Sequence, residues 1–62
     1  MDKLLKRAMI DADVNNAAEL SRLSGVEYQS VKNALNGKDA KLSNVVKMFS
    51  AMGFELKYAA KA

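Results

Sequence analysis

The 62-residue sequence contains no cysteine, no histidine and no proline. Without cysteine the chain forms no disulfides, and without cysteine and histidine it lacks the usual ligands of a structural zinc ion. The same absence removes common enzymatic nucleophiles and bases, and no glycine-rich phosphate loop is present. We therefore expect no catalytic activity, no metal and no cofactor. A domain this short then depends on close helix packing or on a partner subunit for its stability.

Long apolar runs are missing as well. No run approaches the roughly 20 residues that span a bilayer. The N-terminal stretch MDKLLKRAMIDAD carries charges throughout and has no apolar signal core. We therefore expect a cytoplasmic protein without a membrane partner. Half of the residues are apolar and 27% are charged, which is a globular composition. The length corresponds to one domain, spanning residues 1–62.

The positive charge is concentrated in one part of the chain. The net charge is +3, and residues 28–50 alone account for it, because the remaining residues sum to zero. That stretch contains one aspartate and four lysines, namely Lys32, Lys38, Lys41 and Lys47. A basic stretch of this kind indicates a polyanion partner. The alternative is a lysine-rich surface that contacts only solvent, and charge alone does not separate the two.

Apolar spacing predicts four helices, at about 2–12, 17–24, 27–35 and 40–52. Glycines and capping residues separate them. Asn15 or Asn16 is expected to cap the second helix, and Asp39 the fourth. In the second helix, Leu20 and Leu23 are expected in the core. The fourth helix has the strongest apolar stripe, formed by Leu42, Val45, Val46, Phe49 and Met52.

The segment after Gly53 alternates apolar and polar residues, which predicts a short strand. A strand without a partner in its own chain can pair with its copy in a second subunit. The candidate dimerisation residues are Met52, Phe54, Leu56 and Tyr58. The alternative is that Phe54 and Leu56 pack against the core of their own subunit.

The second and third predicted helices are short and are joined by a tight turn at Gly25, as in a DNA-binding helix-turn-helix. The third helix would bury Val31, Ala34 and Leu35 and offer its other face to the major groove. That face carries side-chain types that read base edges. Its residues are Glu27, Tyr28, Gln29, Ser30, Lys32 and Asn33.

The stretch AELSRLSGVEYQSVKNALNGK, residues 18–38, resembles the phage-repressor and Cro family of helix-turn-helix proteins, also called lambda-repressor-like. The resemblance lies in the start of the first motif helix, the turn, the recognition helix and the loop after it. The matching segments are Ala18-Glu19-Leu20, Ser24-Gly25-Val26, Gln29-Ser30-Val31 and Asn36-Gly37-Lys38. The later stretch LSNVVKMFSAMGFEL is similar to the next helix of the family.

This resemblance implies an all-α, compact bundle of four or five helices that binds operator DNA as a homodimer. It places Asn16 and Ala17 where helix N-terminal amides meet a phosphate. It places Asn36, Lys38 and Lys41 in the loop that follows the sugar-phosphate backbone. Glu27 stands where the family often has Ser, Thr or Gln.

The sequence therefore predicts a sequence-specific DNA-binding transcriptional regulator, and it favours a repressor over an activator. The C-terminal alternation makes the chain similar to Cro-like and antitoxin-like members of the family. An antitoxin-type module that binds a toxin protein as well as DNA is the main alternative. RNA binding or a role in chromosome architecture is a third.

Overall fold

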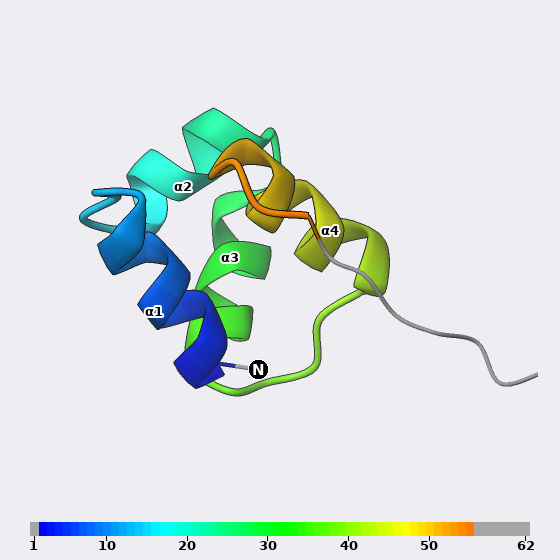
Figure 1. Ribbon diagram of the computed structural model, residues 1–62. Helices are drawn as coiled ribbons and strands as arrows, with labels where there is room; N and C mark the ends of the chain where they lie inside the picture. The colour runs from blue at the N-terminus through cyan, green and yellow to red at the C-terminus, as the bar shows by residue number, and fades with distance from the viewer. Residues whose placement is uncertain (1, 56–62) are drawn as a thin grey trace, which may run out of the picture.

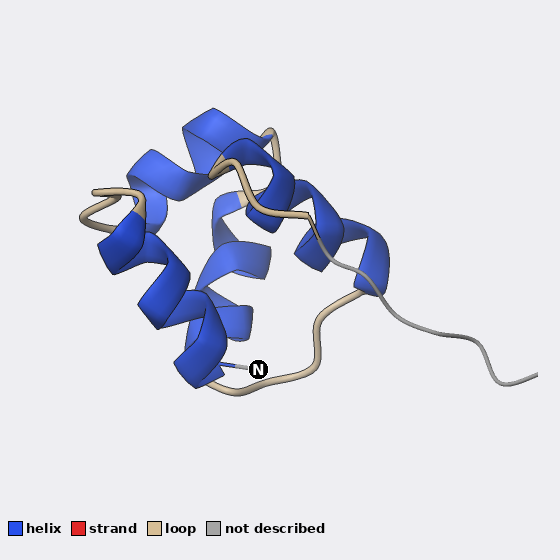
Figure 2. Ribbon diagram, viewed as in Figure 1, coloured by secondary structure: helices blue, strands red, loops and turns tan. Residues whose placement is uncertain are grey.

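A computed structural model describes residues 2–55 as four α-helices with no strand among them (Figure 2). The helices are α1 (Asp2–Asp11), α2 (Ala17–Ser24), α3 (Tyr28–Leu35) and α4 (Leu42–Ala51). Helix α2 packs against both α3 and α4, and α1 packs against α3. Figure 1 shows α3 between α1 and α4, with α2 across one end of it. The expectation of an all-helical, compact bundle is confirmed at this level.

One apolar cluster holds the four helices together. Each helix contributes one fully buried side chain, namely Leu5, Leu20, Val31 and Met48. Burying such a side chain stabilises the fold by about 1.5–3 kcal/mol. Seven further residues complete the buried cluster: Ala8, Met9, Val14, Val26, Ala34, Val45 and Phe49. No polar or charged side chain is buried among residues 2–55. The core is therefore purely apolar, and the polar side chains of α3 lie outside it.

Three leucine or valine side chains predicted to lie in the core are exposed instead. Leu23 is 53% exposed, Leu42 59% and Val46 42%. At the end of α2 the chain turns and buries Val26, whereas Leu23 stays mostly exposed. In α4 the buried face is centred on Met48, which places Leu42 and Val46 on its flank. The prediction of an apolar stripe in α4 was correct, but its centre was misplaced.

The start of α4 also differs from the prediction. Its N-cap residue is Lys41, whose side chain makes no capping hydrogen bond, so the assignment of Asp39 as the cap was wrong. Asp39 lies two residues before the cap, outside the helix. A lysine at a helix N-terminus is not stabilised by the helix dipole, which favours anions there.

Helix α1 ends in a Schellman motif on a residue that is not glycine. Asp13 has a φ of 58°, in the left-handed region that aspartate tolerates better than most residues. The Val14 N–H donates to the Met9 carbonyl at 2.8 Å, and the Asp13 N–H donates to the Ile10 carbonyl at 3.2 Å. Val14 and Met9 are both buried, which supplies the apolar contact typical of this motif.

Candidate nucleic-acid interface

The connection between α2 and α3 is held by two serine hydroxyls and one glycine. Gly25 follows α2 with a φ of 75°, and its N–H donates to the Ser21 carbonyl at 2.9 Å. The Ser21 hydroxyl donates to the Val26 carbonyl at 2.6 Å. The Ser24 hydroxyl donates to the Leu20 carbonyl at 2.7 Å and accepts from the Val26 N–H at 3.2 Å. These bonds fix the direction in which α3 leaves the turn.

Helix α3 has one buried face and one open face, as the sequence predicted. Val31 and Ala34 are buried in the cluster. Glu27, the N-cap residue, makes no side-chain capping bond and is exposed. The other five predicted base-reading residues are exposed or half-buried: Tyr28, Gln29, Ser30, Lys32 and Asn33. The open side of α3 therefore carries a row of polar side chains that are accessible from outside the protein.

Two pairs of side chains on this open side interact one helical turn apart. The Lys32 Nζ lies 5.6 Å from the centroid of the Tyr28 ring, within the range of a cation–π contact. The Gln29 Nε2 donates to the Asn33 Oδ1 at 3.1 Å. The sequence indicated these residue types but not their pairing. Each contact restricts the rotamers of the longer side chain in the pair, Lys32 or Gln29, before any ligand is bound.

The start of α2 is capped as predicted. The Asn16 side chain accepts from the Glu19 N–H at 2.8 Å, and the Glu19 carboxylate accepts from the Asn15 N–H at 3.3 Å. The structure thus selects Asn16 rather than Asn15 as the N-cap residue. Capping fixes the first turn, whose amides give this end of the helix a partial positive charge.

A hollow of about 320 Å³ lies at this end of α2, and we call it the α2 hollow. It brings the predicted residues Asn16 and Ala17 together with Asn36 from the end of α3. Lys6 of α1 borders it as well. Sequence reasoning gave no role to Lys6, because only the packing of α1 against α3 brings it to this place. Besides Lys6 and three asparagines, the hollow is lined by apolar side chains, among them Ile10, Val14 and Leu35, so its lining alone does not favour an anion.

A second hollow, of about 360 Å³, separates α3 from the segment that leads into α4, and we call it the α3–α4 hollow. It unites Ser30, Asn33 and Glu27 with Lys41, so four of the predicted residues border one space. Asp39 and Asn44 complete its polar side. Asn44 was not predicted, since its place in the first turn of α4 became clear only when the start of that helix was known. The hollow holds two carboxylates beside one lysine.

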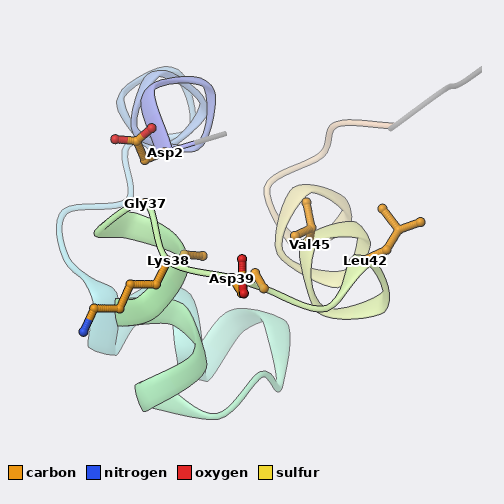
Figure 3. Close-up of a pocket in the computed structure, with 8 residues that line it drawn as sticks. Asp2, Gly37, Lys38, Asp39, Leu42 and Val45 are labelled. Atoms are coloured by element: carbon orange, nitrogen blue, oxygen red, sulfur yellow. The ribbon is translucent and has the colours of Figure 1, made fainter.

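A third hollow, of about 340 Å³, lies between the start of α1, the residues after α3 and the start of α4. Figure 3 shows Asp2 beside Gly37, with Leu42 and Val45 across the space. A Cβ atom built on Gly37 would lie 3.8 Å from the Asp2 carboxylate. The Lys38 side chain runs away from α4 and along α3 in the same view. Lys38 thus borders this hollow, and its exposed side chain extends away from α4.

The predicted dimerisation residues are only partly within the described chain. Met52 is half-buried against the core and Phe54 is 39% exposed. The Phe54 N–H donates to the Phe49 carbonyl at 2.9 Å, which ends α4. Phe54 and Glu55, at the start of the predicted strand, are not in a strand, and Leu56 and Tyr58 lie outside the described residues.

Among residues 2–55, no group of three or more metal-ligating side chains is gathered. None of the helices in that range is both long and apolar enough to cross a membrane. No protein-family model, curated protein or solved structure matches the chain significantly. The site must therefore be interpreted from its own chemistry.

Proposed function

We propose that this protein is a sequence-specific DNA-binding transcriptional regulator with a lambda-repressor-like helix-turn-helix formed by α2 and α3. The observation that supports it best is the open side of α3. A short helix fixed at a stiff turn offers Tyr28, Gln29, Lys32 and Asn33 outward while its other face is buried. In this proposal α3 enters the major groove, and its open side faces the base edges.

Groups suited to phosphates accompany this helix. The start of α2 with Asn16 and Ala17, the loop residues Asn36 and Lys38, and Lys41 at the start of α4 would contact the sugar-phosphate backbone. Such contacts position the protein on the duplex and release counterions. With about three phosphates neutralised per subunit, log K of a dimer should fall with log salt at a slope near −5.

Two copies of the chain would read two half-sites about one helical turn apart. Homodimerisation is part of the proposal, with Met52, Phe54, Leu56 and Tyr58 as its candidate residues. Sedimentation of a variant truncated after Glu55 tests whether Leu56 and Tyr58 are needed for the dimer. If the truncated protein remains dimeric and still binds DNA, the C-terminal segment is not the dimer interface. It would then be free for a protein partner, as an antitoxin requires.

Selection of bound sequences from random duplex DNA tests the function itself. We expect enrichment of one palindromic site, because a symmetric dimer presents two identical α3 helices. NMR titration with the selected duplex should move the amide signals of α3 and of the α2 start. Recovery of random sequences, or α3 signals that stay unmoved, would reject the proposal. Repression rather than activation is tested by a reporter gene carrying the selected site in its promoter.

A further inference from the structure

Gln29 and Asn33 lie one helical turn apart on α3, and their side-chain amides are joined by a hydrogen bond. The Gln29 Nε2 donates to the Asn33 Oδ1 at 3.1 Å. Gln29 is exposed, whereas Asn33 is half-buried and borders the α3–α4 hollow. The shorter, better-packed side chain therefore holds the longer and more exposed one. The bond fixes the plane of the Gln29 amide before DNA arrives.

The atoms that remain available on Gln29 define what it can recognise. A glutamine amide has two N–H groups and one carbonyl oxygen. With one N–H given to Asn33, the other N–H and Oε1 form an edge with one donor and one acceptor. In the major groove adenine offers N7 as acceptor and its N6 amino group as donor, whereas guanine offers the two acceptors N7 and O6. Only adenine among the purines complements this edge.

We infer that Asn33 is a positioning residue that orients Gln29 to read an adenine in each half-site. The inference rests on the proposed function and makes it more specific, since it names the base and the residue that sets the preference. Asn33 is the shorter side chain and is half-buried, and its Oδ1 accepts from Gln29, whereas Gln29 is the longer and exposed side chain. Gln29 is therefore the residue placed to read the base, and Asn33 acts through Gln29.

Substitutions at Asn33 separate positioning from direct contact. Asn33→Asp keeps an oxygen that accepts from Gln29 and removes the amide donor, whereas Asn33→Ala removes both. The measured quantity is the ratio of Kd values for the selected duplex and for the same duplex with that adenine replaced by guanine. We expect a ratio on the order of 5- to 150-fold for the unmodified protein.

Asn33→Asp should keep this ratio within about a factor of two, although every duplex binds more weakly because a new carboxylate faces phosphates. Asn33→Ala should lower the ratio at least about threefold, and Gln29→Ala should bring it close to one. Lys47→Ala, on the exposed side of α4, is the control and should leave the ratio unchanged, because Lys47 lies outside the proposed interface. Retained thermal unfolding midpoints show that the variants are folded.

A base analogue tests the contact at one atom. Replacing each adenine of the selected duplex in turn by 7-deazaadenine removes the N7 acceptor. The unmodified protein should lose at least about fivefold in affinity at one position of each half-site, whereas Gln29→Ala should lose nothing more there.

The inference is overturned if Asn33→Ala keeps the full preference for adenine, or if Asn33→Asp loses it as completely as Gln29→Ala does. The latter result would make Asn33 a direct base contact. A protein that binds duplexes of any sequence equally would instead remove the proposed function, and the two failures are thus distinguishable.

Discussion

The Ser21 hydroxyl donates a 2.6 Å hydrogen bond to the backbone carbonyl of Val26, which joins the middle of α2 to the residues that lead into α3. Val26 is buried, so its carbonyl has little access to water. A partly buried carbonyl that loses its donor is costly, and the loss would act at the turn that directs α3. This bond therefore links the stability of the turn to the presentation of the candidate reading helix.

Replacing Ser21 by alanine should lower the free energy of unfolding by about 1–2 kcal/mol, because the Val26 carbonyl loses its partner. Urea unfolding followed by circular dichroism measures the change. Ser50→Ala, on the exposed side of α4, is the control and should stay within about 0.5 kcal/mol of the unmodified protein. Equal midpoints for the two variants would show that the Ser21 bond contributes nothing to the turn.

Gly25 tests the backbone of the same turn. With a φ of 75° and no atom within 4 Å of a Cβ built on it, a side chain there meets strain but no clash. Gly25→Ala should therefore cost about 1–2 kcal/mol of unfolding free energy. Gly25→Asn should cost clearly less, since asparagine tolerates the left-handed region. If both variants lost the same amount, the backbone angle would not be the cause.

The positions of the helices followed from the sequence because apolar spacing and capping residues are local signals. The predicted ends of all four helices lie within two residues of those observed. Val31 and Ala34 were placed correctly in the core because the face of α3 they share packs against both α1 and α2. Local signals also identified Asn16 as a capping candidate and Gly25 as the turn.

Features that depend on neighbours distant in sequence were missed. Leu23 and Val46 look like core residues from their spacing, but they remain 53% and 42% exposed. Lys6 reaches the α2 hollow only because α1 packs against α3. Ser21 bonds to Val26 across a turn whose geometry does not follow from residue types. Tertiary contacts, rather than propensities, decide these cases.

Lys38 tests the electrostatic part of the proposed function. Lys38→Ala should weaken binding to all duplexes to a similar degree, because a phosphate contact carries no sequence information. In a dimer this substitution should make the slope of log K against log salt concentration less negative by about 2, since one phosphate contact is lost in each subunit. Lys47→Ala is the matched control, because Lys47 is exposed on α4 and lines none of the three hollows.

Binding isotherms at four or more salt concentrations give both slopes. An equal reduction for Lys38→Ala and Lys47→Ala would show that the lysines act through net charge alone. A Lys38→Ala variant that weakens only some sequences would place Lys38 on a base edge instead of a phosphate.

Glu27 is the least expected residue of the interface, and two substitutions separate its effects. As N-cap residue of α3 it forms no side-chain capping bond, and its carboxylate borders the α3–α4 hollow together with Asp39. Glu27→Thr supplies a hydroxyl that can accept from an amide of the first turn, and should stabilise the fold by about 1 kcal/mol. Glu27→Gln removes the charge without supplying that cap, and should leave stability nearly unchanged.

Both substitutions should tighten binding to every duplex by about 0.5–1 kcal/mol per subunit in low salt, because a carboxylate near phosphates is removed. The gain should shrink as salt is added. A carboxylate that accepts from the cytosine N4 amino group behaves differently, since its loss weakens one base preference and leaves the others. Parallel selections with the unmodified protein and Glu27→Gln distinguish these cases. If a cytosine disappears from the site selected by Glu27→Gln, Glu27 reads that base.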